Sequence, residues 1–352
     1  MIAESPATIA WPPFVCPRCH GPLSHDDRGW SCLPCAAEYP VVLGIADFRV
    51  APDPWISLTD DHEKARRLLE QTEGASFEST VRAYWEMTPE TPKDLADHFT
   101  RSVLRGEARA EEWLDTQFTS TALNSLTHPV LDLGCGTGDL LAVLARRGVP
   151  AIGIDIAFRW LVQARRRPAL TGGAQRLVCC NAEALPFPSG SFSVVSAMNM
   201  LEHCQQPRIS IREVLRVVID DGTVRLRTVN RYSVLPEPHV NIWGVGFFPR
   251  SLSDRYVRWR SGQRYLHHRL LSAAELRRTL RDAGFTSVRV TAATLLPHEV
   301  ERVPARWRWI VRAYDRIRRT RLLGGVVALV APLLDASGSR ARVSPSTEPV
   351  SV

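Results

Sequence analysis

Val130-Leu-Asp-Leu-Gly-Cys-Gly-Thr-Gly-Asp139 is the most informative stretch of this 352-residue chain. Its first four residues are expected to form a strand, and a helix is expected from about residue 140. Between them lie Gly134, Gly136 and Gly138. Glycines let the backbone turn sharply and approach a ligand closely, and in doubly wound sheets such a turn follows the first strand. The stretch therefore predicts a strand–turn–helix unit with a ligand at the turn.

Two acids in the same stretch indicate which kind of ligand this is. Asp139 stands where a dinucleotide-binding pattern has its third glycine, and Asp132 precedes the first glycine by two residues. A carboxylate beside the helix N-terminus would repel a pyrophosphate. A cationic ligand without phosphate tolerates both acids, which favours S-adenosylmethionine over a dinucleotide.

Short apolar strands alternate with helices on both sides of this unit. Strands are expected near 130–133, 151–154, 176–179, 193–197, 223–228 and 287–290. Helices are expected near 140–147, 157–166, 209–217 and 272–283, the last with a capping box from Ser272 to Glu275. This alternation predicts an α/β fold with right-handed crossovers and a doubly wound, mostly parallel sheet.

Four cysteines near the N-terminus form a separate motif. Cys16, Cys19, Cys32 and Cys35 have the spacing C-x2-C-x12-C-x2-C. Two close pairs of this kind can present four thiolates tetrahedrally to one Zn²⁺, which leaves no coordination position for water. A segment this short cannot bury enough apolar surface to fold alone, so a structural zinc ion would stabilise it.

These patterns divide the chain into five parts. We expect a zinc ribbon at 1–50, a helical connecting region at 51–127 and the sheet domain at 128–295, with an insertion near 230–270. A basic amphipathic helical arm is expected at 296–335, and small and polar residues predict a disordered tail at 336–352.

From about Pro129 to Val290 the sequence resembles the class I S-adenosylmethionine-dependent methyltransferases, in the small-molecule, ubiquinone/menaquinone-methyltransferase-like branch. The resemblance implies that the glycine stretch holds the methionine end of the cofactor and that Asp155 binds the ribose hydroxyls. Asn181 occupies the position of the family's aspartate, which meets the adenine amino group; an amide oxygen can accept the same bond. The expected cofactor-binding residues are Asp132, Gly134, Gly136, Gly138, Asp155, Ile156, Asn181, Ala182 and Asn199.

The residues that would handle the methyl acceptor are expected beyond the fourth strand and in the insertion. His203 is the best-placed candidate base, with Glu202 beside it, although a histidine that only orients the loop fits equally well. The insertion resembles those that cover the acceptor pocket in this family. Its candidate substrate residues are His239, Asn241, Trp243, Tyr265 and His267.

The charge of the chain is concentrated near its C-terminal end. The formal net charge is +7, and the segment from Glu301 to Arg321 alone carries eight arginines against two acids. Val303, Trp307, Ile310, Tyr314 and Ile317 share one helix face, and an apolar stretch follows. Such an arm fits an anionic membrane surface through 302–334, a polynucleotide, or simple packing on its own domain.

Three functions remain open on the sequence alone. The first is methyl transfer, most simply O- or C-methylation, to a small or lipid-linked acceptor. The second is RNA methylation that uses the ribbon and the arm. The ribbon resembles the small zinc ribbons that activate methyltransferases; a ribbon can also grip RNA, as in ribosomal RNA guanine methyltransferases, although the ligands there follow a different spacing. The third is a non-catalytic scaffold. We expect no secretory signal and no spanning helix, hence a cytoplasmic protein with peripheral contact at the inner membrane surface. The oligomeric state is left open.

Overall fold

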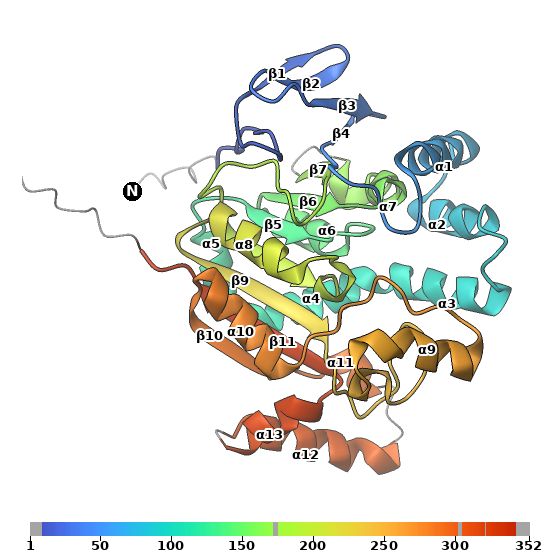
Figure 1. The fold of residues 1–352 in the computed structure, drawn as a ribbon, viewed down its shortest axis with the longest axis vertical. Helices are drawn as coiled ribbons and strands as arrows, with labels where there is room; N and C mark the ends of the chain where they lie inside the picture. The colour runs from blue at the N-terminus through green and yellow to red at the C-terminus, as the bar shows by residue number, and fades with distance from the viewer. Residues whose placement is uncertain (1–8, 172–174, 302–304, 321, 343–352) are drawn as a thin grey trace, which may run out of the picture.

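The computed structural model describes residues 9–171, 175–301, 305–320 and 322–342. Its strands form one sheet with the order β1-β2-β3-β4-β7-β6-β5-β8-β9-β11-β10 (Figure 1). The strands are β1 (Leu23–Asp26), β2 (Gly29–Cys32), β3 (Glu38–Val42), β4 (Ile45–Asp47), β5 (Val130–Leu133), β6 (Ala151–Asp155), β7 (Gln175–Cys179), β8 (Phe192–Met198), β9 (Val218–Val229), β10 (Thr286–Ala292) and β11 (Leu333–Ser339).

The centre of the sheet is parallel. Strands β7, β6, β5, β8 and β9 pair in parallel in that order, and chain order reverses on either side of β5. β11 is antiparallel to both of its neighbours, β9 and β10. The α/β prediction of a doubly wound, mostly parallel sheet is confirmed. In such sheets ligands bind beyond the carboxyl ends of the strands at the point where the order reverses, which here is the end of β5.

Helices cover both faces of the sheet. Apolar residues of α8, α10 and α13 pack on one face and those of α1, α4, α6 and α7 on the other. The predicted helical region at 51–127 contains α1 to α5. The α-helices are α1 (Leu58–Gln71), α2 (Phe77–Glu86), α3 (Lys93–Leu104), α4 (Gly106–Gln117), α5 (Ser120–Asn124), α6 (Asp139–Arg146), α7 (Phe158–Ala164), α8 (Pro207–Val217), α9 (Arg250–Ser261), α10 (Ala273–Ala283), α11 (Pro297–Glu301), α12 (Arg308–Arg318) and α13 (Leu323–Val330). The 3-10 turns are η1 (Pro168–Leu170), η2 (Leu201–His203), η3 (Val245–Phe247) and η4 (Ala305–Trp307).

The start of α10 follows the sequence pattern. The side chain of Ser272 accepts a hydrogen bond from the Glu275 amide, and the Glu275 carboxylate accepts one from the Ser272 amide. The predicted capping box is therefore confirmed. Gly284 ends the helix in the left-handed conformation, with φ 113°.

The prediction of a disordered tail at 336–352 is wrong for its first residues, which belong to a strand. Strand β11 runs through Ser339, and its first residues, Leu333 to Asp335, fall in the segment expected to be a helical arm. The small residues that suggest disorder are needed for packing, because a Cβ at Gly338 would lie 3.0 Å from the Phe285 side chain. Buried Leu334 and Ala336 point to the same face of the strand as Gly338. Residues 343–352 lie outside the described residues.

The N-terminal ribbon is joined to the edge of the sheet. Leu43 and Gly44 turn in the left-handed region and separate β3 from β4. β4 then pairs in parallel with β7, and the Phe48 amide donates to the carbonyl of Cys179 at 2.7 Å. Figure 1 shows the ribbon at the opposite end of the molecule from α12 and α13.

The C-terminal arm contains the two short helices α12 and α13 before the chain returns as β11. Tyr314 anchors α12, because its hydroxyl donates to the carbonyl of Ala293 at 2.9 Å. Trp309 and Ile310 remain exposed. Val303, which the sequence places on the same helix face, lies outside the described residues. Among the helices that the structure describes, none is both long and apolar enough to cross a membrane.

Candidate active site

The glycine turn after β5 leaves space for a ligand. Gly134, Gly136 and Gly138 have φ values of 77°, 51° and 79°, which other residues rarely adopt. A Cβ at Gly134 would lie 2.2 Å from Cγ of Met200, so this glycine accommodates the loop after β8. No atom lies within 4 Å of a Cβ built at Gly136. The backbone at Gly136 can therefore be approached by a ligand.

Asp155, at the end of β6, faces this turn. One of its carboxylate oxygens accepts a hydrogen bond from the Gly136 amide at 2.9 Å, and the other accepts one from the Ala157 amide at 2.8 Å. Burial nevertheless raises the pKa of Asp155 to about 6, because the two amide bonds offset only part of the desolvation. Each oxygen keeps a lone pair for a further donor, such as a ligand hydroxyl.

Two further carboxylates lie at either end of the glycine turn. Asp132 is 4% exposed, and burial together with the charges of Asp139 and Asp155 raises its pKa to about 8. Burial also raises the pKa of Asp139, although Arg167 forms an ion pair with it. The negative charge of Asp155 disfavours ionisation of buried Asp132, and a cation bound beside them would favour the ionised form. This electrostatic pattern agrees with the ligand preference inferred from the sequence.

Asn181 holds the connection between the ribbon and α1. Its side-chain oxygen accepts hydrogen bonds from the amides of Val50 and Ala51 at 2.8 and 3.2 Å, and its nitrogen donates to the carbonyl of Ala51 at 3.2 Å. An aspartate has no donor for that carbonyl, which explains the asparagine at this position. The expected adenine contact would compete with these bonds. Ala182 is partly buried against the core beside it.

An ion-pair network that the sequence analysis missed links this connection to the Asp155 turn. Arg49 is fully buried and donates to Asp61 at 2.7 Å and to the carbonyl of Ile156 at 3.0 Å. Asp61 also accepts from the Phe158 amide at 2.8 Å and from Arg159 at 3.0 Å. Nothing in the local sequence distinguishes Arg49 or Asp61 from surface residues. Their partners become evident only when the fold brings α1 and α7 together.

The residues after β8 meet the insertion at 230–270. His203 Nε2 lies 3.2 Å from Nε2 of His239, so two residues that the sequence singles out separately are neighbours. His239 Nδ1 contacts the carboxylate of Glu237. Glu202 is 1% exposed; one of its oxygens accepts from the Thr228 hydroxyl at 2.7 Å, and the other has no hydrogen-bond partner among the described residues.

The insertion has a small core of its own, and His268 belongs to it. Tyr265 is buried and stacks on His268 with ring centroids 5.0 Å apart. Both line a cavity of about 60 Å³, together with Arg250 and Ser253. In the sequence His268 belongs to one polar cluster with Tyr265 and His267, but it is not among the candidate substrate residues. The His267-His268 pair is visible in the sequence, but only the fold shows which ring turns toward His203.

The remaining predicted residues lie at the margin of this cluster. Asn199 and Asn241 are exposed and adopt left-handed backbone conformations, with φ values of 50° and 54°. Trp243 is 60% exposed, and its indole nitrogen donates to the carbonyl of Val234. His267 contacts Gln205. The structure gives these residues turn and surface positions rather than places inside the histidine cluster.

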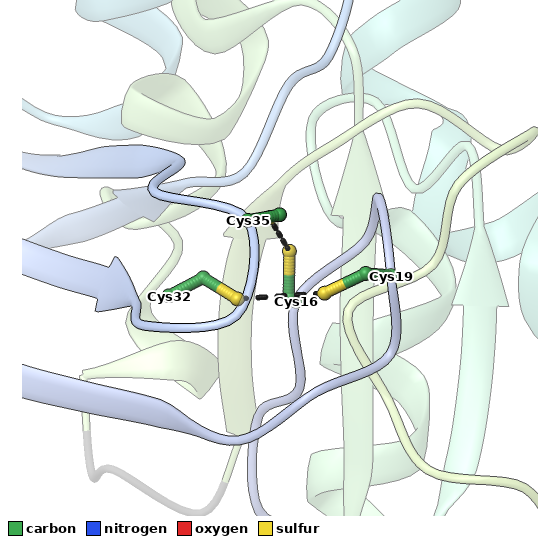
Figure 2. A group of neighbouring side chains, drawn as sticks. All are labelled: Cys16, Cys19, Cys32 and Cys35. Atoms are coloured by element: carbon green, nitrogen blue, oxygen red, sulfur yellow. Dashed lines mark hydrogen bonds between the residues drawn. The ribbon is translucent and has the colours of Figure 1, made fainter.

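The four N-terminal cysteines converge on one point, as Figure 2 shows. Their sulfur atoms all lie within 4.8 Å of one another, with Cys16 3.5 Å from Cys35 and Cys19 3.4 Å from Cys32. The residue after each pair, His20 or Ala36, is left-handed, so the two pairs form equivalent turns.

One thiol of this group is prepared for ionisation. Burial raises the pKa of Cys16, but hydrogen bonds from Tyr39 and from backbone amides outweigh it and lower the pKa to about 6. Four sulfur atoms at these separations suit one tetrahedrally coordinated metal ion.

Residues 131–226 match the methyltransferase domain family. The Ubiquinone biosynthesis O-methyltransferase of Pseudomonas paraeruginosa is 33% identical over 165 residues, which cover 46% of this chain and 65% of that protein. The protein of the same name from Neisseria meningitidis is 33% identical over 166 residues, or 44% of this chain and 62% of that protein. The chain therefore spans less than two thirds of the length of these curated relatives.

Two solved structures that match part of this chain are a methyltransferase alone and a complex of a methyltransferase with an activator. A methyltransferase from Mesorhizobium loti gives a TM-score of 0.45 at 18% identity, over 66% of this chain and 98% of that one. The complex of the Haloferax volcanii Trm112 methyltransferase activator with a putative methyltransferase gives 0.40 at 20% identity, over 68% of this chain and 96% of that one. With both TM-scores below 0.5, the fold assignment follows from the strand order instead.

Proposed function

We propose that this protein is an S-adenosylmethionine-dependent methyltransferase that methylates an oxygen atom of a small, lipid-linked acceptor. The single observation that carries the proposal is the open glycine turn facing the carboxylates of Asp132 and Asp155 at the point where the sheet order reverses. The methyltransferase family match over 131–226 covers the same residues.

The residues of the turn have distinct roles in this proposal. S-adenosylmethionine supplies a methyl group on a positively charged sulfur. The open backbone at Gly136 admits the ligand, and Asp155 accepts hydrogen bonds from its ribose hydroxyls. Asp132 favours its positive charge. Since the leaving group is neutral, the protein contributes chiefly alignment and a matched electrostatic environment.

Oxygen is the proposed acceptor atom for two reasons. The relatives that cover the same residues are named as O-methyltransferases. A hydroxyl acceptor must also lose a proton, and the histidine cluster beyond β8 contains side chains that can accept it. Burial and the neighbouring His239 lower the pKa of His203, whereas Glu237 offsets the effect of burial on His239 and raises its pKa. His239, held by Glu237, is therefore a stronger base than His203.

An exposed apolar surface beside the insertion supports a lipid-linked acceptor. We define this lid surface as Val234, Trp243, Phe247 and Val330, all exposed. The residues are continuous, because Val234 bonds to the backbone of Val330 in α13, Trp243 bonds to Val234, and Trp243 stacks on Phe247. An apolar face this close to the acceptor side suits contact with a bilayer that holds the acceptor.

Positive charge next to the lid surface points to anionic lipid. Exposed Arg312 and Arg316 lie on α12, which packs against α13. Leu329, on α13, is 53% exposed and extends the apolar face. Arginines around an apolar face are typical of peripheral membrane contact rather than of a spanning segment.

The ribbon is proposed to be a structural zinc site that supports the cofactor site within the same chain. The four cysteines supply a complete ligand set. The ribbon continues into β4, which pairs with β7, and then into Val50 and Ala51, which Asn181 holds. Folding of the ribbon around the metal is thus connected by backbone pairing to the end of β7.

The proposal is tested by methyl transfer from radiolabelled S-adenosylmethionine. A catechol with a polyprenyl chain is offered in anionic vesicles, in neutral vesicles, and beside its chain-free analogue and structured RNA. We expect labelling of the prenylated catechol, fastest on anionic vesicles, and Leu329→Glu should lower vesicle binding without changing labelling of the soluble analogue. Salt-sensitive labelling of RNA instead would overturn the acceptor class, and binding of S-adenosylhomocysteine without labelling of any hydroxyl acceptor would overturn O-methylation.

A further inference from the structure

A second group of metal-binding side chains lies at the acceptor side, far in the sequence from the cysteine cluster. His203 ends η2, His239 lies in the turn between Glu237 and Ile242, and His268 follows α9. One ring nitrogen from each lies within 4.8 Å of the others. Three separate segments thus bring three imidazoles to one point beyond the carboxyl end of β8.

The orientation of His239 is fixed by a buried carboxylate. Glu237 is 4% exposed and accepts hydrogen bonds from the amides of His239 and Val240 at 2.9 and 3.1 Å. The same carboxylate contacts Nδ1 of His239, which places the ring proton on Nδ1. The lone pair of Nε2 is then directed toward His203. A carboxylate behind a histidine in this way is the usual outer partner of a metal ligand.

The separations match the coordination of a small divalent ion. Metal–nitrogen bonds of about 2.0–2.1 Å in a tetrahedron put the nitrogens about 3.4 Å apart. The His203–His239 nitrogens are 3.2 Å apart, and the nitrogens of all three histidines lie within 4.8 Å of one another. His203 and His239 are both exposed on one side, so a fourth position would face solvent.

Unsatisfied polar atoms surround this point. Nδ1 of His268 and one carboxylate oxygen of Glu202 are buried and have no hydrogen-bond partner among the described residues. Such atoms are costly to bury without a partner. Glu202 also lies close enough to interact electrostatically with His239. Glu202 and Glu237 flank the three imidazoles, and these two carboxylates form an environment that favours a cation.

We propose that His203, His239 and His268 bind a divalent transition-metal ion, Zn²⁺ or one with a similar preference for imidazole nitrogen, with one coordination position open. Three protein ligands and an open position distinguish this site from the closed cysteine site. Only the role of this ion in catalysis rests on the proposed function: there the open position would take the acceptor hydroxyl, and the ion would replace His239 as the group that promotes loss of the hydroxyl proton. The proton would pass to water, and the oxygen would attack the methyl carbon as the carbon–sulfur bond breaks and neutral S-adenosylhomocysteine leaves.

Metal stoichiometry tests the proposal without cofactor or acceptor. Tag-free protein is dialysed against Zn²⁺ and analysed by mass spectrometry, then reconstituted with Co²⁺ for absorption spectroscopy. We expect two metal equivalents. One should show thiolate-to-cobalt charge transfer from the cysteine site, and the other only weaker ligand-field bands. His268→Ala should lose the second equivalent alone, whereas the neighbouring control His267→Ala should keep both.

Further variants separate ligand loss from unfolding. If His268→Ala unfolds, His203→Gln and His239→Asn give the same measurement, and Glu237→Gln should weaken the second metal about 10- to 100-fold while leaving the first unchanged. One equivalent in the wild-type protein, or two in all three histidine variants, would overturn the proposal. Because S-adenosylhomocysteine binding is measured separately, its absence would count against the proposed function and not against the metal site.

Discussion

Replacing Asp132 by asparagine removes one buried ionisable group and leaves the volume of the side chain nearly unchanged. The pKa of Asp132 is raised from its ordinary value of 3.8 to about 8 by burial and by the charges of Asp139 and Asp155. At about 1.4 kcal/mol per pKa unit, the ligand-free protein loses on the order of 4 kcal/mol of stability at pH 7 through this carboxyl. Asparagine has no proton to lose, so Asp132→Asn should recover much of that loss.

The sign of the pH dependence follows from the direction of the shift. A carboxyl whose folded-state pKa is raised contributes its stability fully below about pH 3.8, and that contribution is lost as the pH rises toward 8. Between pH 5 and pH 8 the stability advantage of Asp132→Asn over the wild type should therefore grow by about 3–4 kcal/mol. Urea unfolding at both pH values measures it, with Asp27→Asn in an exposed turn as the control.

The same substitution should have the opposite effect on ligand binding. A cation bound beside Asp132 gains from the ionised carboxylate, so wild-type affinity for S-adenosylmethionine should rise from pH 6 to pH 9. In Asp132→Asn that rise should be reduced and the affinity lower. A stability difference that stays constant between pH 5 and pH 8 would refute the electrostatic description of the site.

Three further variants test the parts of the structure around the site. Cys16→Ser should remove the metal of the ribbon, lower the unfolding temperature and weaken S-adenosylhomocysteine binding; unchanged metal content would contradict the ribbon assignment. Asn181→Asp removes the donor to the Ala51 carbonyl and should cost about 1–2 kcal/mol in urea unfolding, and a neutral effect would show that this bond does not hold the connection. Deleting residues 333–352 removes β11 and should abolish folding seen by circular dichroism, whereas deleting 343–352 should not; survival of the longer deletion would refute the strand.

The sequence predicts the central sheet because its signals are local. Each central strand is a short apolar run, and the spacing of the three glycines after β5 indicates a sharp turn. The same locality explains the failure at β11. Gly338 and Ala336 resemble a disordered tail until Phe285 is known to lie above them, a contact between residues more than 50 positions apart.

The residues of the candidate site also fall into two groups, those that a local motif indicates and those that only tertiary contacts bring together. Gly136 follows from the glycine motif and Asp155 from the resemblance to the methyltransferases, which implies that both contact the cofactor; the structure adds that they bond to each other. The use of Asn181 on the ribbon connection, the Arg49–Asp61 pair and the grouping of His268 with His203 depend on tertiary contacts. No spacing in the sequence encodes them.

Calorimetric titration with S-adenosylhomocysteine tests the central claim most directly. Wild-type protein with its ribbon metal should bind one equivalent with micromolar affinity. Asp155→Ala removes a charged acceptor of two hydroxyl bonds, worth about 1.5–3 kcal/mol, so its affinity should fall by about 10- to 100-fold. Folded wild-type protein that does not bind, or an Asp155→Ala variant that binds as tightly as the parent, would contradict the assignment of the glycine turn to this cofactor.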